Sequence, residues 1–510
     1  MAGVDRLLSE TMDATPRGSR SGSRIALLVG CASFLFFLLL QHGHFKGSDE
    51  LAVYEMSRSI LENGDLAVPP LRHTEVGADG RRYSYFAPGQ SVLALPLFAL
   101  AEPLGAVLPT AWSEALAGPP NRRGAYRFGG ELEATLVGLF GPLSAAALIA
   151  LFFVFQLDLG VSPRRAVIVA LLVAMSTHTA VMSAYFLRHT TEAITLLGAL
   201  LLFRRFSQSG SLKTLGIGSA LASLTLLIRV PAAIAAPTLA SYLVWVLYQR
   251  GEWRMGGARF AGVLAAILMP LGIALAIHVG ISEAKWGSWL ISPMVEQQGR
   301  FNNPLLRGLA GLLLSPGSSI FVYSPLLLLA PFGLTRLWRR ERALTAAALA
   351  LTATWLLFYA RFDGWSGLWS APGPRYLFLL VPLLLLPLGL WLDSPRRWAA
   401  ASLLAIAGLF VQLVSTLVRW GSVPGLADYP ILGPDQADFL FQISRSPVVV
   451  MTGLLASGGP IDSWLWNLWH GWEGFAGHPG AVVALLGLWT AAASVCGIGL
   501  RRALCATRVS

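Results

Sequence analysis

The sequence has little charge and little cysteine. Only 13% of its 510 residues are charged and 55% are hydrophobic, whereas soluble domains carry about 25% charged residues. This composition excludes a disordered chain, a nucleic-acid-binding domain and a small secreted module, and it predicts an integral membrane protein. The three cysteines, Cys31, Cys496 and Cys505, lie in or beside apolar runs near the chain ends. They form neither a disulfide framework nor a metal-ligand spacing.

The net charge of +11 has a topological interpretation. In a soluble chain, an excess of 38 Lys and Arg over 27 Asp and Glu would indicate a nucleic-acid partner. In a membrane protein the same excess records orientation, because cytoplasmic loops collect Lys and Arg. We therefore expect membrane lipids around the chain and no nucleic acid as a partner.

Thirteen apolar runs are candidates for spanning helices, which need about 17 to 25 apolar residues. The run 89–108 contains Pro96, Glu102 and Pro103, which leave it short as a span, and we expect it to lie at the outer interface. The other twelve are predicted to span, at residues 25–41, 132–156, 166–184, 190–203, 214–228, 231–248, 260–281, 319–337, 343–360, 376–392, 399–418 and 480–500. The predicted fold class is an all-α polytopic membrane protein of about 12 helices.

Twelve helices place both termini in the cytoplasm and make every inner loop basic. The inner side then holds 21 basic and 7 acidic residues, about +14, and leaves −3 outside. The first run follows a polar, Arg-bearing leader and lacks a small-residue cleavage site, so we expect an uncleaved anchor. The long connections, 42–131, 282–318, 361–375 and 419–479, are all outer, and function concentrates on such loops. We predict a multi-pass protein of the cytoplasmic membrane with an outer active site.

Two acidic residues stand at the start of the first outer loop. Apolar positions between Leu51 and Leu61 recur at helical spacing and predict a helix with Ser48 as its N-cap and Asp49 and Glu50 in its first turn. Carboxylates there complement the helix dipole, which is a purely structural explanation. They could equally act as a general base toward a hydroxyl or amine acceptor. Spacing alone does not separate the two.

The residues that follow resemble a known group of enzymes. An Asp-Glu pair just past the first helix, an amphipathic helix ending in Gly-Asp-Leu-Ala-Val-Pro69, and the segment Tyr83-Ser-Tyr85-Phe-Ala-Pro-Gly-Gln-Ser91 resemble the bacterial glycosyltransferases of the GT-C superfamily. Protein O-mannosyltransferases and the lipid A aminoarabinose transferase belong to this group. The resemblance covers the first 160 residues and loosely the helix layout. It implies a leader at 1–24, a GT-C-like transmembrane catalytic domain at 25–418, and a long outer loop with the last helix at 419–510.

The resemblance also implies roles for particular residues. It makes Asp49 the catalytic base, with Glu50 as its neighbour. Relatives often carry a lysine at the position where this chain has Tyr85. In this chain, Arg81 or Arg82 would therefore have to contact the donor phosphate in its place. Arg375 follows a Gly-Trp-Ser segment that resembles another family strip. The residues expected to line the substrate site are Tyr83, Tyr85, His189, Trp365, Trp369 and Tyr376.

A lipid-phosphate donor needs cations at the outer interface to stabilise its leaving phosphate. Arg375, Arg188, Lys285 and Arg229 are placed for this, and Lys285 and Arg229 are the weaker candidates. Each could instead reach lipid headgroups as an ordinary helix-end cation. No metal-binding spacing is present, so we expect no obligatory cofactor or metal, although His189 with the carboxylates leaves a divalent ion open.

The predicted function is an inverting glycosyltransferase. It would move a sugar from a polyprenyl-phosphate donor to a glycan, lipid or protein acceptor on the outer face. A transporter or flippase of lipid-linked sugars is a rival, but almost every spanning run is free of charge, which argues against ion coupling. An O-antigen-type polymerase or ligase is the other rival, with a long outer loop like 419–479.

Overall fold

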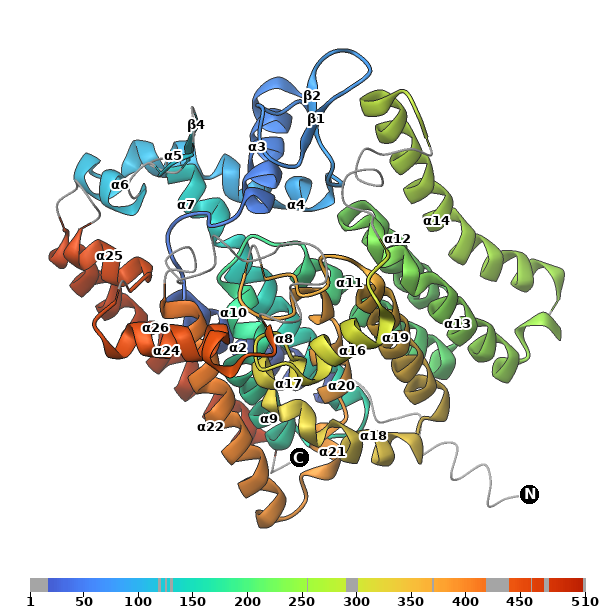
Figure 1. The fold of residues 1–510 in the computed structure, drawn as a ribbon. Helices are drawn as coiled ribbons and strands as arrows, with labels where there is room; N and C mark the ends of the chain where they lie inside the picture. Colours follow the sequence, from blue (N-terminus) through green and yellow to red (C-terminus); the bar gives the residue numbers. More distant parts are fainter. Residues whose placement is uncertain are drawn as a thin grey trace.

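The protein is a bundle of apolar helices that carries a smaller, mainly helical cap at one end (Figure 1). The computed structural model describes residues 17–117, 121–123, 126–128, 132–254, 256–289, 301–368, 371–418, 440–459, 461–471 and 477–507. The bundle contains α2 (Arg17–Leu39), α8 (Phe140–Asp158), α9 (Pro163–Ser176), α10 (His178–Ser183), α11 (His189–Ser209), α12 (Leu212–Ile228), η1 (Val230–Ala235), α13 (Ala236–Arg250), η2 (Glu252–Arg254), α14 (Gly257–Trp286), α16 (Leu305–Leu314), α17 (Ile320–Tyr323), η3 (Pro325–Leu329), α18 (Ala330–Trp338), α19 (Arg342–Arg361), η4 (Arg375–Leu377), α20 (Leu380–Leu385), α21 (Leu388–Trp391), α22 (Pro395–Leu417) and α26 (Pro479–Ala506).

The cap is built from the segment predicted to form the first outer loop. It contains α3 (Ser48–Asn63), α4 (Gly89–Ala99), α5 (Ala101–Val107), α6 (Thr110–Ala117), α7 (Leu132–Gly138) and the antiparallel pairs β1 (Thr74–Val76) with β2 (Arg82–Ser84) and β3 (Asn121–Arg123) with β4 (Tyr126–Phe128). The later outer segment adds η6 (Ile443–Arg445), α24 (Pro447–Ala456) and α25 (Trp464–His470). The α3 helix, β1 and β2 stand above the bundle in Figure 1.

Eight described helices are long and apolar enough to cross a membrane, by length and composition. Seven of them coincide with predicted spans. The eighth, Gly89–Val107, is the run expected at the interface, and in the structure it is two helices, α4 and α5, that pack against α7. The other five predicted spans are helical as well, but shorter, interrupted or flanked by charge. The chain is thus an all-α, multi-pass membrane protein, and the number twelve stays a prediction.

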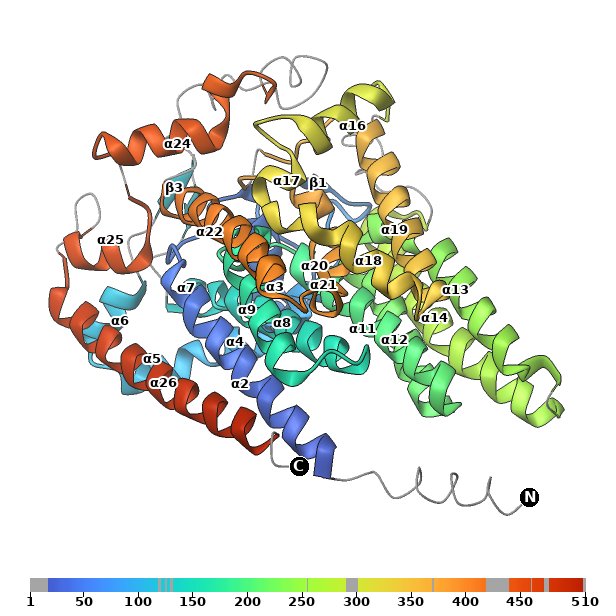
Figure 2. The ribbon, with the colours of Figure 1, turned by 90° about the horizontal axis from the view of Figure 1, so that it is seen from below.

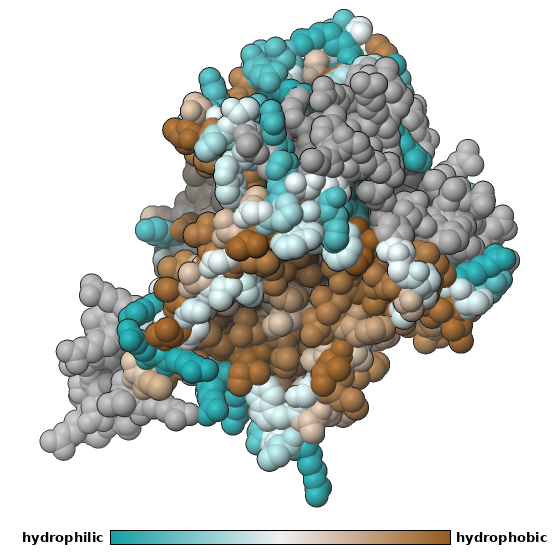
Figure 3. Space-filling model, turned by 90° about the vertical axis from the view of Figure 1, so that its left-hand side faces the viewer, coloured by the Kyte–Doolittle hydropathy of each residue, from teal (hydrophilic) through white to brown (hydrophobic). Residues whose placement is uncertain are grey.

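The hydrophobic surface agrees with this fold class. Figure 3 shows brown, apolar side chains gathered across the middle of one face, with teal, hydrophilic side chains above and below them. Many large apolar side chains of the outermost helices are exposed, such as Leu268 and Met269 of α14 and Leu403 of α22. A surface of this kind is costly in water and is the surface that lipid tails cover.

The first and last helices run antiparallel, side by side (Figure 2). The indole N–H of Trp489 donates to the carbonyl of Leu35 at 2.7 Å, and the thiol of Cys496 to that of Leu28 at 3.2 Å. Because Leu28 precedes Leu35 while Cys496 follows Trp489, the start of α2 and the end of α26 lie at the same end of the bundle. Its assignment to the cytoplasm remains a prediction from loop charge.

Loops that were expected inside meet at this end. Gly22 of α2 faces Leu157 near the end of α8. Arg204, at the end of α11, binds the carboxylates of both Asp158 and Glu341. These contacts join three predicted inner loops to the start of the first helix.

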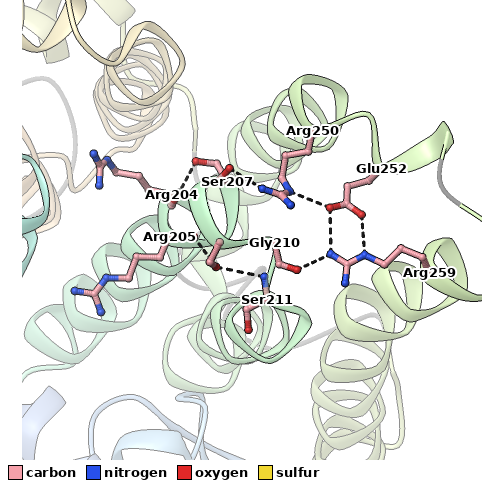
Figure 4. A network of polar contacts seen from close by, with 9 residues as sticks. Arg204, Arg205, Ser207, Gly210, Ser211, Arg250, Glu252 and Arg259 are labelled. Atoms are coloured by element: carbon pink, nitrogen blue, oxygen red, sulfur yellow. Dashed lines mark hydrogen bonds and ion pairs between the residues drawn. The ribbon is translucent and has the colours of Figure 1, made fainter. Parts of the chain in front are cut away.

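A second polar network ties α11, α13 and α14 together there (Figure 4). Glu252 accepts hydrogen bonds from Arg250 at 2.9 Å and from Arg259 at 3.0 Å. Arg250 also donates to the carbonyl of Ser207 at 2.9 Å, and Arg259 donates to that of Gly210 at 2.5 Å. The basic residues of this end are therefore used to hold loops together.

At the opposite end, the bundle helices are interrupted. Thr177 separates α9 from α10, Arg229 ends α12 just before Pro231, and residues 362–374 separate α19 from η4. Irregular backbone at membrane depth is tolerated only where it is buried in protein or lines a cavity. Residues at two of these breaks, Arg229 and Arg375, line the same pocket as Asp49 of α3.

Candidate active site

Glu50 fixes the start of α3 above the interrupted helices. The N-cap is Gly47, one residue before the expected Ser48. One oxygen of Glu50 accepts the backbone N–H groups of Lys46 and Gly47 at 2.9 Å, and the other accepts that of Phe186 at 2.7 Å. The first two bonds close the helix start, and the third joins it to the α10–α11 connection. The structure thus gives Glu50 a positioning contact, and its share in catalysis stays a prediction.

Asp49 is buried, and its two oxygens have different partners. Oδ1 lies 2.9 Å from Nε2 of His73, and Oδ2 lies 3.1 Å from Nη2 of Arg375. Burial raises the pKa of the Asp49 carboxyl, but Arg375, His73 and the more distant Arg188 outweigh it and hold this pKa well below its usual range. In the ligand-free protein Asp49 is therefore an ionised and weakly basic carboxylate.

His73 was not found from the sequence, and its backbone is unusual. Among the described residues it is the one non-glycine residue with a positive φ, at +70°, a region that side chains other than Asn, Asp and His rarely adopt. Its carbonyl accepts the backbone N–H of Tyr85 at 3.1 Å, and its ring lies 5.7 Å from that of Phe86. Strain of this kind persists where surrounding contacts impose it, often at functional sites. Here it directs the imidazole to Asp49.

Arg375 is held by a turn built from separate parts of the chain. The ring N–H of His178 donates to the carbonyl of Pro372 at 2.8 Å. Gly373 has φ +87°, and a Cβ there would lie 2.8 Å from both His178 and Tyr323, so a side chain would not fit. The turn leads straight into η4, which starts at Arg375 with 2% of that residue exposed. This packing aims the guanidinium at Asp49.

A cleft of about 530 Å³, which includes its open mouth, lies in front of Asp49. Its lining combines three arginines with histidines, aromatic side chains and a few apolar residues: Asp49, His73, Tyr85, Phe86, Ala87, Arg188, His189, Arg229, Val230, Pro231, Arg375 and Tyr376. The cleft therefore brings together the first outer loop, the α10–α11 and α12–α13 connections and the start of η4. Asp49 is the one carboxylate among its described lining residues.

Arg188 contacts an aromatic side chain of the cleft. Its guanidinium lies 3.6 Å above the ring of Phe86, which is a favourable cation–π distance. No hydrogen bond or ion pair joins it to another residue in the described ranges. Burial lowers the pKa of Arg188 to about 10, partly offset by Asp49, so the side chain stays charged at neutral pH. It can donate to an anion without giving up a protein partner.

Arg229 is paired inside the protein. Its Nη1 donates to both oxygens of Glu192, at 3.0 and 2.8 Å. The rings of Tyr359 and Tyr376 stack 4.8 Å apart, and each lies 5.5 Å from this guanidinium. Glu192 neutralises Arg229 and Asp49 neutralises Arg375, so the cleft retains the charge of Arg188.

Three predicted phosphate-binding cations take other roles. Lys285 is 3% exposed and donates to the carbonyls of Ser84 and Phe86 at 3.2 and 3.3 Å. It therefore connects the end of α14 to the end of β2 and the residues that follow it. Arg81 is exposed and pairs with Asp65. Arg82 donates to the carbonyl of Thr74 at 3.4 Å. None of the three belongs to the described lining of the cleft, in contrast to Arg188 and Arg375.

The predicted substrate-lining residues divide in the same way. Tyr85, His189 and Tyr376 line the cleft. The hydroxyl of Tyr83 donates to Asp79 at 2.6 Å on the hairpin, outside that lining. Trp365 is fully buried against Gly311, where it supports the chain before Arg375 and does not line the cleft. Trp369 lies outside the described residues.

A second buried charge cluster joins Asp462 to the residues just before α3. Asp462 lies 3.0 Å from both Lys46 and His44 and accepts from Asn467 at 3.2 Å. Burial raises the pKa of Asp462, but Lys46 and His44 hold it well below its usual range. Lys46 is four residues before Glu50, so this cluster also supports the start of α3. Within the described residues, no group of three or more His, Cys, Asp or Glu could hold a metal ion.

We expect Asp462→Asn to lower the free energy of unfolding by about 3 kcal/mol at pH 7, because it removes the carboxylate from the buried Lys46. The folded-state pKa of Asp462 lies below the value of about 3.9 in an unfolded chain. Its contribution is therefore complete above that value and is lost as the pH falls below it. Unfolding of both proteins in detergent at pH 7 and below pH 4 checks this, since the difference should shrink in acid. An equal difference at both pH values would contradict the assignment.

Comparison with solved structures identifies the fold. The apo structure of ArnT from Cupriavidus metallidurans aligns with 84% of this chain and 76% of its own, at 14% identity and a TM-score of 0.50. The same protein bound to undecaprenyl phosphate aligns with 85% of this chain and 77% of its own, at 14% identity and a TM-score of 0.46. The apo oligosaccharyltransferase of Archaeoglobus fulgidus aligns with 83% of this chain and 60% of its own, at 13% identity and a TM-score of 0.45. No family model and no curated sequence matches the chain. The likeness to apo ArnT shows the fold, which is of the GT-C type expected from the sequence.

Proposed function

We propose that this GT-C-fold protein is an inverting glycosyltransferase that takes its sugar from a polyprenyl-phosphate donor and transfers it on the outer face of the cytoplasmic membrane. The observation that carries the proposal is the cleft in which one carboxylate, Asp49, faces three arginines. A transfer of this type needs a base for the acceptor and cations for the leaving phosphate, within reach of one sugar.

The charges of the cleft match a single phosphate group. Arg375 and Arg229 each have a carboxylate partner, whereas Arg188 keeps its donors available. A sugar linked through a phosphodiester carries one negative charge, and Arg188 can receive it. Tyr376 and His189 line the remaining wall, where hydroxyl and ring groups can contact a sugar.

The proposed reaction is a single displacement. Asp49 accepts the proton of the acceptor hydroxyl or amine, whose oxygen or nitrogen then forms a bond to the anomeric carbon. The bond between that carbon and the phosphate oxygen breaks, and its electron pair leaves with the polyprenyl phosphate. The phosphate gains one negative charge in this step, and the arginines stabilise that developing charge. Attack opposite the leaving group inverts the anomeric centre.

A transporter of lipid-linked sugars fits the site less well. Interrupted helices are present, as in many transporters, but the interruptions at Arg229 and before Arg375 border the same cleft as Asp49. A buried carboxylate that lines one cleft with three arginines suits transfer of a phosphate-linked sugar better than passage of the intact donor. An O-antigen-type polymerase or ligase would also be a glycosyltransferase, and the choice of acceptor distinguishes it.

A donor panel tests the proposal directly. The purified protein in liposomes is incubated with labelled sugars on undecaprenyl phosphate and with an extract of membrane lipids and glycans as acceptors. We expect one donor to be consumed with release of undecaprenyl phosphate and formation of a labelled product of inverted configuration. Movement of intact donor across the bilayer without release of the phosphate would instead support a flippase.

Arg188→Gln should weaken the binding of this donor. Losing a charge-assisted hydrogen bond costs about 1.5–3 kcal/mol, which corresponds to an increase of about tenfold to 100-fold in the KM for the donor. The matched control is Arg81→Gln, the same substitution at an exposed arginine outside the described lining of the cleft. Equal KM values for the two variants would argue against Arg188 as the phosphate ligand.

A further inference from the structure

The resting structure leaves Asp49 poorly suited to act as a base. A general base is effective when its pKa lies near the working pH. Arg375 binds Oδ2 at 3.1 Å and occupies the oxygen that would receive the acceptor proton. A cation this close also lowers the affinity of the carboxylate for a proton. The proposed reaction therefore requires a change in this contact before the acceptor is deprotonated.

The two partners of Asp49 differ in how firmly they are held. His73 is fixed by its own backbone, through the bond from Tyr85 at 3.1 Å and the contact with Phe86. The guanidinium of Arg375 is at the end of a long side chain that lines the same cleft as Arg188. It carries a positive charge, so an incoming phosphate attracts it.

We propose that His73 and Arg375 are a permanent and an exchangeable partner of Asp49: His73 keeps the carboxylate oriented, while Arg375 leaves Oδ2 for the donor phosphate and so opens that oxygen to the acceptor. The inference rests on the proposed function. His73 is then a positioning residue, because it acts on the acceptor only through Asp49. The exchange makes donor binding a condition for the basicity of Asp49, so the donor binds before the acceptor.

The surroundings of Arg375 agree with an exchange. In the ligand-free cleft, Arg188 is repelled by Arg229 and Arg375, and Arg375 is repelled by Arg229. A phosphate placed between Arg188 and Arg375 would relieve that repulsion and take up both sets of donors. The phosphate thus gains a second cation in the same event that releases Asp49.

Infrared difference spectroscopy can follow the protonation of Asp49 without any reagent entering the cleft. The band of its protonated carboxyl is identified by its absence in Asp49→Asn. Undecaprenyl phosphate is the probe, and its binding is measured separately by calorimetry. We expect no Asp49 band at pH 5 in the free protein and a clear band at pH 5 once the lipid is bound. Bound lipid with no band would overturn the inference alone, whereas absence of binding would overturn the proposed function and the inference with it.

Arg375→Gln separates the exchange from simple repulsion by the phosphate. We expect this variant to show the band at pH 5 without lipid and to change less than twofold when lipid binds. A band that still depends on the lipid, as in the wild type, would mean that Arg375 is not the exchanged group.

The role of His73 needs a kinetic readout. We expect His73→Ala to lower kcat at least tenfold while the KM for the donor changes less than threefold, because the carboxylate loses its orientation but the phosphate site is intact. His73→Gln keeps an N–H donor at a similar reach and should recover most of kcat. Equal losses in the two variants, or a loss that appears only in KM, would contradict the positioning role.

Discussion

Asp49→Asn should lower sugar transfer by about 10²–10⁴-fold, the contribution of a general base. The substitution keeps the shape of the side chain and its hydrogen bond to one of its partners, so the fold should persist. Release of undecaprenyl phosphate from the active donor measures the loss, and thermal unfolding in detergent checks the fold. Donor binding should be kept, because Arg188 is unchanged.

Asp65→Asn is the matched control for this result. Asp65 lies in the same outer loop and also pairs with an arginine, Arg81, but outside the described lining of the cleft. We expect it to transfer sugar at nearly the wild-type rate. Full activity of Asp49→Asn, or an equal loss in both variants, would show that Asp49 is not the base.

Arg229→Met should be the most destabilising of the substitutions considered. It leaves the carboxylate of Glu192, which is 2% exposed, without its two hydrogen bonds from Arg229. Breaking a buried ion pair by removing one partner costs about 3–5 kcal/mol, because a buried charge is left uncompensated. Unfolding of the protein in mixed micelles by added SDS measures the change.

The double variant Arg229→Met with Glu192→Gln distinguishes the loss of the ion pair from the cost of burying an unpaired Glu192 carboxylate. A neutral amide is much cheaper to bury than a carboxylate, so the double variant should recover most of the stability. Arg336→Met is the surface control, because its pair with Asp393 is exposed and 3.7 Å long, and such pairs contribute about 0–1 kcal/mol. A single Arg229→Met variant as stable as this control would contradict the interpretation of Glu192 as a buried, ionised group.

Several elements were predictable because local chemistry decides them. Apolar runs of sufficient length must form helices in a bilayer, where each backbone group needs a partner, and all twelve predicted runs are helical in the structure. The helix after the first span followed from the spacing of its apolar residues, and its acidic first turn from Asp49 and Glu50. The N-cap was misplaced by one residue because Ser48 and Gly47 are both good cap residues.

Which residues line the cleft depends on tertiary contacts that no local sequence pattern predicts. Arg188 and Arg375 both line the cleft, and each stands beside a turn between apolar helices. Arg81, Arg82 and Lys285 have equally suitable local sequences, but their partners are the carboxylate of Asp65 and the carbonyls of Thr74, Ser84 and Phe86. A single sequence does not show which of several cations will find a partner within the protein.

His73 was missed for the same reason. Its neighbours form no motif, and its importance comes from a positive φ and a contact with a residue 24 positions earlier. Similarly, His178 supports the turn before Arg375 through the carbonyl of Pro372, which is 194 positions later in the chain.

The sequence by itself determined the membrane character, the helical fold class and the acidic start of the first outer loop, because length, hydropathy and helix spacing are local properties. The tertiary structure decided which of the two carboxylates faces the cleft, which arginines accompany it, and that Asp49 is held between His73 and Arg375. The physical reason is that burial and ion pairing depend on distances between residues far apart in the chain. These distances exist only once the interrupted helices have packed beneath α3.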